Sequence, residues 1–151
     1  MTFECGEATR MQPSEASFVE RAGLTGHVTL IVADAARESG VERALEPFSG
    51  AMPELIFRDS THDYATTKRE LGLWVPRMAP HSLMLVNGTS TMSSNWDESG
   101  RGGPRKALRD FARWRRDIAY LNLNEPVGSS GQADPALTYA DGVGMALLQK
   151  R

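Results

Sequence analysis

Short apolar runs recur along this chain, and segments with helical spacing separate them. Three of these runs are "HVTLIVAD" (residues 27–34), "ELIF" (54–57) and "SLMLV" (82–86). Mostly apolar runs of this length, with β-branched residues among them, are typical of strands buried within a sheet. We therefore expect three strands here, each followed directly by a polar residue.

The segments between the runs predict helices. Residues 14–22 follow Pro13, which suits the start of a helix, and Gly23 suits its end. Residues 35–46 place apolar side chains at helical spacing, and residues 64–78 have the most regular apolar face in the chain. An alternation of strand and helix predicts a parallel sheet with helices on both faces.

The last third of the chain has a different pattern. Residues 88–103 are polar and rich in Gly and Ser, which predicts a long loop of the kind that often carries function. We expect a helix over 104–117, then strands in "IAYLNL" (118–123) and "GVGMALLQK" (142–150). Two strands with no helix between them should pair antiparallel. The prediction is a three-layer α/β fold, mostly parallel with an antiparallel C-terminal strand, forming a single domain over residues 1–151.

Composition narrows the class of protein. The chain has 151 residues, 40% of them hydrophobic, which is enough for the core of one soluble domain. Its 17 basic and 19 acidic residues give a net charge of -2, so we expect neither a nucleic acid nor a membrane surface as partner. No apolar run reaches the roughly 20 residues of a membrane span. Cys5 is the only cysteine, which fits a reducing compartment, so we expect a cytoplasmic protein.

Polar residues follow the proposed strands at one edge of the sheet. They are Glu4 after "MTF", Asp34 after "LIVA", Asp59 and His62 after "LIF", and Asn87 after "LMLV". Ligands of open parallel sheets bind outside the carboxyl ends of the strands. Strand ends are polar in most proteins, so each residue also has a purely structural interpretation. Several acids at one edge favour a ligand with hydroxyl groups or a cationic centre.

Two segments carry a family resemblance. "FVERAGLTGHVTLIVADAAR" resembles the part of class I S-adenosylmethionine-dependent methyltransferases that leads into their third strand and its Asp-Ala pair. "LIFRDSTHDYATTKRELGLWVPRMAPHSLMLVNGTS" is similar to the small-molecule O-methyltransferase branch, including the cephalosporin hydroxylase-like group. The order and spacing of these motifs extend over residues 16–150. The resemblance implies a Rossmann-like methyltransferase sheet and methyl transfer to the hydroxyl group of a small molecule.

The resemblance also implies roles for five residues. Glu4 matches the acid that binds both ribose hydroxyls of S-adenosylmethionine, and Asp34 with Ala35 matches the pair that binds its adenine. Asp59 matches the acid that faces the methionine end of the cofactor and takes part in catalysis. His62 matches a histidine in the same turn, a candidate base near the acceptor oxygen.

The chain departs from the family pattern at two places. The family's first strand and glycine-rich loop have no counterpart before Glu4, so we expect an N-terminally truncated sheet with two interior edges that lack a neighbour. These edges close on each other, or another copy fills the gap in a homo-oligomer, or the chain is a fragment of a longer protein. Where metal-dependent members carry an acid after the fifth strand, Asn87 and Gly88 stand here. A hard cation would then keep only Asp59 and Asn87 as oxygen ligands, which is a poor set, so we expect no metal site.

A second function, from a different class, fits the same residues: a non-catalytic interaction module that self-associates through exposed sheet edges. Three smaller signals also leave alternatives. His62 is either a base or a hydrogen-bonded turn residue, and Trp96 is either a lid over the acceptor or a loop aromatic packed on the sheet. The basic residues of segment 105–116 could bind a phosphate or RNA, although the balanced charge of the chain favours a solvated helix face.

Overall fold

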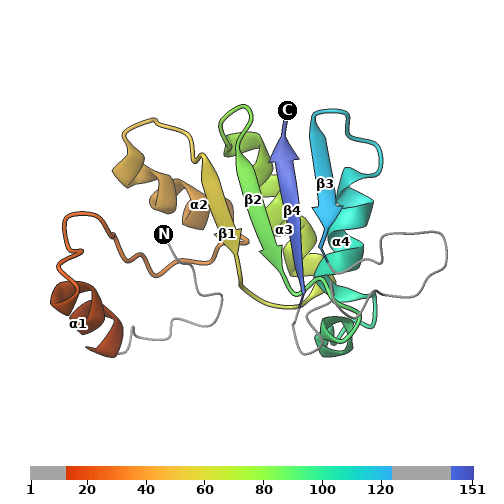
Figure 1. Ribbon diagram of the computed structural model, residues 1–151, viewed down its shortest axis with the longest axis horizontal. Helices are drawn as coiled ribbons and strands as arrows, with labels where there is room; N and C mark the ends of the chain where they lie inside the picture. The colour runs from red at the N-terminus through yellow and green to blue at the C-terminus, as the bar shows by residue number, and fades with distance from the viewer. Residues whose placement is uncertain (1–12, 124–143) are drawn as a thin grey trace.

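The computed structural model describes residues 13–123 and 144–151, which form a four-stranded mixed sheet with helices against it (Figure 1). The α-helices are α1 (Pro13–Arg21), α2 (Glu38–Leu45), α3 (Tyr64–Trp74) and α4 (Gly103–Ala112). Three 3-10 helices are η1 (Glu46–Phe48), η2 (Val75–Arg77) and η3 (Ser93–Trp96). The strands are β1 (Leu55–Arg58), β2 (Leu83–Asn87), β3 (Ile118–Asn122) and β4 (Met145–Lys150).

The strand order across the sheet is β1-β2-β4-β3. β1 and β2 pair in parallel, and β4 pairs antiparallel with both of its neighbours, β2 and β3. β1, β2 and β3 therefore run in one direction and the C-terminal strand in the other. This arrangement confirms the predicted α/β sheet, which is mostly parallel with an antiparallel C-terminal strand.

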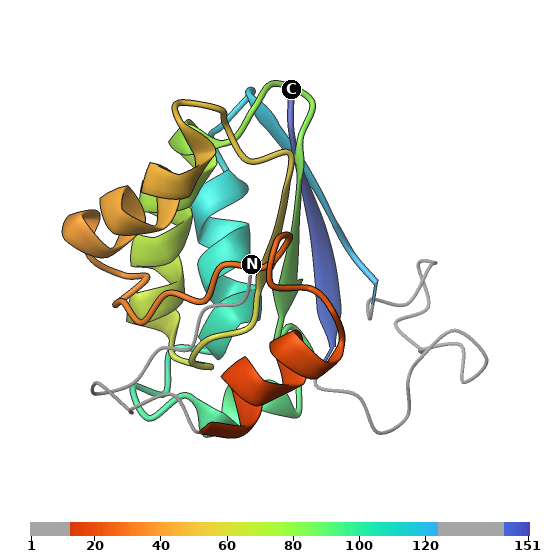
Figure 2. The ribbon, with the colours of Figure 1, turned by 90° about the vertical axis from the view of Figure 1, so that its left-hand side faces the viewer.

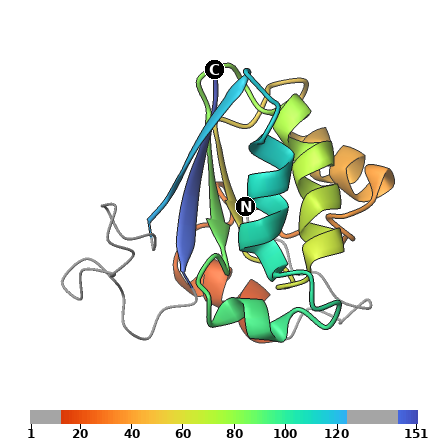
Figure 3. The same cartoon turned by 90° about the vertical axis from the view of Figure 1, so that its right-hand side faces the viewer.

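Helices α2, α3 and α4 lie together on one face of this sheet (Figures 2 and 3). Alternate strand residues point toward them, as the period of two in a strand requires. The hydrophobic core between the helices and the sheet consists of Val41, Ala44, Leu71, Trp74, Val75, Met78, Met84, Val86, Leu108, Ile118, Ala146 and Leu148. The second helical layer expected on the other face is not found in the part of the chain that the structure describes.

α3 is the central helix of this layer, and its sequence explains where it begins and ends. The Asp63 carboxylate caps it by accepting a hydrogen bond from the backbone N–H of Thr66 at 2.8 Å. The helix ends at Trp74, where Val75 and Pro76 continue as η2. The core residues Leu71 and Trp74 face the sheet.

The predicted strand over residues 27–34 is wrong, because this segment has no regular secondary structure. A strand is stable only when its backbone groups pair with a neighbour, and the described residues place no strand beside this segment. Among the described strands β1 lies at the edge of the sheet, and the other of the two expected interior edges, that of the segment before Glu4, lies outside the described residues. The predicted helix over 104–117 is too long, since α4 ends at Ala112.

Candidate functional site

Two adjacent parallel strands end with polar side chains at the same rim of the sheet. Asp59 follows β1 and is exposed, and Asn87 is the last residue of β2. The Asn87 side-chain amide donates a hydrogen bond to the Asp59 carboxylate at 2.7 Å, and its own oxygen accepts one from the Gly88 N–H at 2.8 Å. Asp59 is therefore held in a fixed orientation at the carboxyl ends of the strands.

His62 lies at the same rim, in the turn between Asp59 and α3. Its ring meets the Trp96 ring edge-on, with centroids 5.0 Å apart. Gly88, at the end of β2, has a φ of +82°, and a Cβ there would come within 2.3 Å of His62 Cδ2. Only glycine leaves room for this close approach. The structure therefore brings Asp59 and His62 together with Trp96 from the Ser-rich loop.

The surroundings of His62 favour its neutral form. Burial lowers its pKa most, the positive charge of Arg58 lowers it further, and the negative charge of Asp59 raises it by less. The net effect places the pKa below its usual value of 6.5. At neutral pH the imidazole is therefore uncharged and able to accept a proton.

A buried ion pair lies directly behind this rim. The Arg58 Nε donates to the Glu70 carboxylate at 2.7 Å, and both side chains are almost fully buried. The guanidinium also donates to the Thr61 carbonyl at 2.6 Å and to the Thr67 hydroxyl at 2.7 Å, and Ser60 donates to Glu70 at 2.8 Å. These bonds fix the turn of residues 59–62 to α3.

The sequence analysis missed both Arg58 and Glu70. Two signals could have found them: an arginine at the end of the apolar strand "LIFR", and an acid on the inner face of the following helix. A charge in a buried position needs a partner of opposite sign, and Glu70 is the buried acid within reach.

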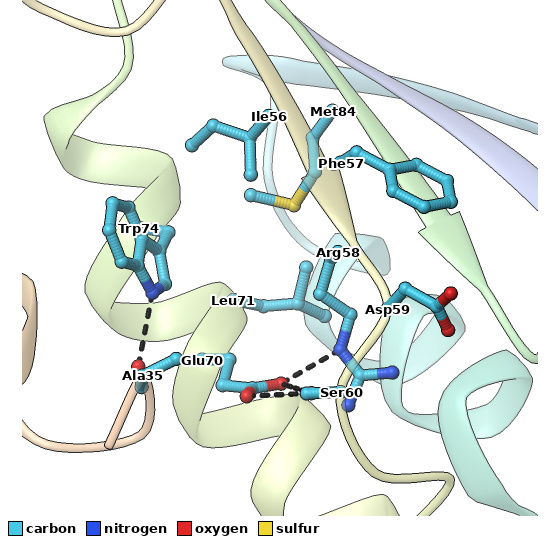
Figure 4. A pocket seen from close by; sticks show the side chains of 10 residues that line it. All are labelled: Ala35, Ile56, Phe57, Arg58, Asp59, Ser60, Glu70, Leu71, Trp74 and Met84. Carbon is cyan, nitrogen blue, oxygen red and sulfur yellow. Dashed lines mark hydrogen bonds and ion pairs between the residues drawn. The ribbon is translucent and has the colours of Figure 1, made fainter. Parts of the chain in front are cut away.

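A pocket opens beside β1, between the strand and α3 (Figure 4). The space inside it that a water molecule can occupy is about 20 Å³, so the pocket is a narrow recess. The walls are mostly apolar, and Asp59, Arg58, Ser60 and Glu70 supply the polar groups. The residues that line it are Ala35, Ile56, Phe57, Arg58, Asp59, Ser60, Glu70, Leu71, Trp74 and Met84.

The other predicted cofactor residues have separate positions. Ala35 lines the pocket, and its carbonyl accepts a hydrogen bond from the Trp74 indole at 3.0 Å. Asp34 does not line it: its exposed carboxylate accepts from the Ala36 N–H at 2.9 Å and pairs with Arg37 at 3.0 Å. Glu4 lies outside the described residues. The structure thus joins Ala35 and Asp59 in one pocket and leaves Asp34 beside it.

The Ser-rich loop is held to the start of α4 by Asp97. This buried carboxylate accepts hydrogen bonds from the Ser99 hydroxyl at 2.7 Å, the Ser99 N–H at 3.1 Å and the Gly103 N–H at 2.8 Å. Burial alone would raise the pKa of Asp97, but these bonds together with one from the Tyr64 N–H lower it strongly. Asp97 is therefore a structural anion that orders the loop carrying Trp96.

The described part of the chain lacks both a metal-ligand cluster and a membrane-spanning helix. Residues 13–123 and 144–151 contain no group of three or more His, Cys, Asp or Glu side chains that could hold a metal ion. None of the helices in these ranges is long and apolar enough to span a membrane.

A sequence family described as a methyltransferase domain matches residues 2–89. This segment is more than half of the chain and contains Asp59, His62 and Asn87. The chain belongs to this methyltransferase family. A search of curated proteins found no match. The methyltransferase domain assignment confirms the family resemblance noted in the sequence.

Solved structures support the methyltransferase fold. An O-methyltransferase from Bacillus cereus in complex with SAH is 17% identical, with a TM-score of 0.57, covering 99% of this chain and 61% of that one. The O-methyltransferase TomG from Streptomyces achromogenes, in complex with SAM, has the same identity and TM-score and is covered over 60% of its length. A putative O-methyltransferase from Klebsiella pneumoniae is 16% identical, with a TM-score of 0.55, covering 90% of this chain and 55% of that one. The chain thus spans about 60% of the length of these relatives.

Proposed function

We propose that this methyltransferase domain binds S-adenosylmethionine and transfers its methyl group to a hydroxyl group of a small molecule. One observation carries the proposal: Asp59 and an uncharged His62 lie together at the carboxyl ends of two adjacent parallel strands, beside an apolar pocket. The solved relatives with SAM or SAH support the choice of cofactor.

The residues around this recess match two parts of the cofactor in their chemistry, and the recess must widen to admit a ring. Ala35, Ile56 and Trp74 provide an apolar wall of the kind that an adenine ring requires. Asp59 provides a carboxylate at the same pocket, which suits the cationic methionine end. We assign adenine contacts to Asp34 and Ala35 and ribose contacts to Glu4, as the family resemblance implies. These assignments are part of the proposal.

The cofactor supplies a methyl group that is activated by its positive sulfur. The work of the chain is to bind the acceptor, orient it and remove its proton. His62 accepts the proton of the acceptor hydroxyl, since its ring is uncharged and no described residue forms a hydrogen bond with it. Trp96, which is 50% exposed, bounds the space beside His62. The oxygen that results is the nucleophile.

Calorimetric titration with SAH tests the binding half of the proposal. We expect the chain to bind SAH, and Asp59→Asn to bind it more weakly because the carboxylate is lost. Glu42→Gln, at an exposed position of α2 that does not line the pocket, removes the same charge and should bind normally. Absence of binding at millimolar SAH would contradict the proposed methyltransferase activity of this chain.

Transfer of a radiolabelled methyl group to a panel of phenols, catechols and aliphatic alcohols tests the chemical half. We expect His62→Asn to lose roughly 10²- to 10⁴-fold in rate, the usual contribution of a general base, while SAH affinity is unchanged. Equal rates for the variant and the parent chain would contradict the role of His62.

The second candidate is a non-catalytic module that self-associates through sheet edges. It is favoured by one observation: among the described strands β1 is at the edge of the sheet, and it carries two exposed apolar side chains, Leu55 and Phe57. A homodimer in sedimentation equilibrium that fails to bind SAH would support this function over the enzyme.

A further inference from the structure

The positive charges of this chain are concentrated around one helix. Residues 105–117 contain six basic and two acidic side chains, whereas the rest of the chain contains eleven basic and seventeen acidic ones. The basic residues are Arg105, Lys106, Arg109, Arg113, Arg115 and Arg116. The net charge of -2 is therefore the sum of a positive segment, residues 105–117, and an acidic remainder of the chain.

The fold arranges part of this segment along a groove. The groove lies between α4 and β3, which are neighbours at one side of the molecule (Figure 3). Its empty volume is about 1100 Å³, much of it open to solvent. The lining includes four cationic side chains, those of Lys106, Arg109, Arg113 and Arg151.

Most of these charges are not neutralised by nearby acids. Asp110 is the acid in the groove, and it already pairs with Lys106 and accepts a hydrogen bond from the Tyr64 hydroxyl at 3.0 Å. Within the described ranges, neither Arg109 nor Arg113 forms a salt bridge. A set of guanidinium groups without carboxylate partners attracts an anion.

Aromatic side chains lie among the cations. Trp114 is 83% exposed, the highest value among the large hydrophobic side chains of the described residues, and the Arg113 guanidinium lies over its ring at 4.9 Å. Tyr120, on β3, lines the groove and is 40% exposed. Trp114 does not itself line the groove, but it contacts Arg113, which does. Its exposed ring can therefore stack on a planar ligand that continues out of the groove.

We propose that this groove binds single-stranded nucleic acid. Guanidinium groups along a groove contact successive phosphates, and exposed aromatic rings stack on bases. An anionic membrane fits less well, because a flat bilayer cannot reach cations that line a groove. The proposal replaces the expectation from net charge, since a total says nothing about where charges lie. It does not depend on the proposed methyl transfer.

The test is fluorescence anisotropy with end-labelled oligouridylate and oligothymidylate of about ten nucleotides, a length within the usual site size. We expect the chain to bind both, with log K falling by about 3 per decade of salt if four phosphates are contacted. Arg109→Gln with Arg113→Gln should weaken binding and reduce that slope by about 1.4. Trp114→Ala should weaken binding by about 5- to 100-fold.

A matched control variant distinguishes the effect of the groove arginines from the effect of a change in net charge. Arg43→Gln with Arg69→Gln removes two exposed arginines from α2 and α3, so it makes the same change in net charge elsewhere. We expect this double variant to bind the oligonucleotides with nearly the parent affinity. If both double variants weakened oligonucleotide binding equally, the proposal that the groove is the binding site would be wrong. It would also be wrong if the affinity of the parent chain did not depend on salt.

Two further measurements decide between partners. Co-sedimentation with phosphatidylglycerol vesicles should show no binding, and vesicle binding that exceeds oligonucleotide binding would overturn the proposal in favour of a membrane. SAH titration of the groove variants should be unchanged, so failure of the groove and failure of the methyltransferase proposal can be told apart.

Discussion

The two faces of the sheet differ sharply although the same strands make both. On the helical face, Met84 and Leu148 are paired neighbours, and both are almost completely buried. On the opposite face, the row Phe57, Leu85, Leu147 and Leu121 crosses the sheet in register. Phe57 at one end of this row is 41% exposed, and Leu121 at the other end is 59% exposed.

The strands are apolar enough to be buried on both faces, but the described residues cover only one of them. The run "LMLV" in β2 is apolar at every position, a pattern typical of strands covered on both faces. In the structure its burial alternates, with Met84 and Val86 covered and Leu83 and Leu85 only half covered. The open face is therefore suited to a further layer, and variants on the two faces should behave differently.

The largest expected effect is at Arg58, on the helical face. Arg58→Ala leaves the Glu70 carboxylate buried without its partner, which should cost about 3–5 kcal/mol of unfolding free energy. Phe57→Ala, the adjacent residue on the open face, should cost about 1 kcal/mol. Urea unfolding followed by circular dichroism measures both. The double variant Arg58→Met with Glu70→Leu should regain most of the loss, and failure to do so would mean that the pair does more than satisfy its own charges.

The next effect compares two adjacent leucines of β4. Leu148 is fully buried among the helices, and Leu147 is half-buried on the open face. We expect Leu148→Ala to cost about 2–5 kcal/mol because it leaves a cavity. Leu147→Ala should cost about 1 kcal/mol, in proportion to its smaller buried area. Equal losses in urea unfolding would show that another layer covers the open face in solution.

A smaller effect concerns the helix that covers the sheet. Asp63→Ala removes the cap of α3 and should cost about 0.5–2 kcal/mol. Asp63→Asn keeps an oxygen that can cap the helix, so it should be nearly neutral. Thermal unfolding of the two variants side by side checks the difference, and a loss that is the same in both would assign it to charge instead of capping.

The smallest effect is a pH dependence of the unfolding free energy, which arises from His62 at the rim of the sheet. The pKa of His62 is lower in the folded chain than its usual value of 6.5, so the unfolded chain binds a proton more readily. The stabilisation is complete above pH 6.5 and is lost as the pH falls from there through the folded pKa. Unfolding free energies measured between pH 5 and pH 8, the range in which histidine titrates, should show this loss in the parent chain. His62→Asn should lack it, and an unchanged profile in that variant would assign the loss to another group.

Much of the fold follows from local patterns in the sequence. β1, β2, α3 and the antiparallel pair β3 and β4 have clear apolar periodicity, and each begins within three residues of its expected start. The strand over residues 27–34 failed because pairing decides whether an apolar run becomes a strand, and pairing depends on a neighbour that periodicity does not reveal.

The candidate site was predictable in part. Asp59 and His62 could be placed at one rim because parallel strands end together. The fit of His62 against Gly88 could not, because it depends on a backbone approach between segments far apart in sequence. Arg58 and Glu70 were each detectable as charges in apolar positions, but their pairing depends on the packing of α3 on β1, which joins residues 12 positions apart.

The position of β4 has a consequence for the order of folding. β4 is the last strand in the chain, yet it lies between β2 and β3, and its pairing with β2 joins residues about 60 positions apart. Contacts of such long range slow folding, because a large loop must close before they form. During synthesis, the facing edges of β2 and β3 must therefore remain unpaired until residues 145–150 have emerged, and up to that point they expose backbone groups that can pair with another chain.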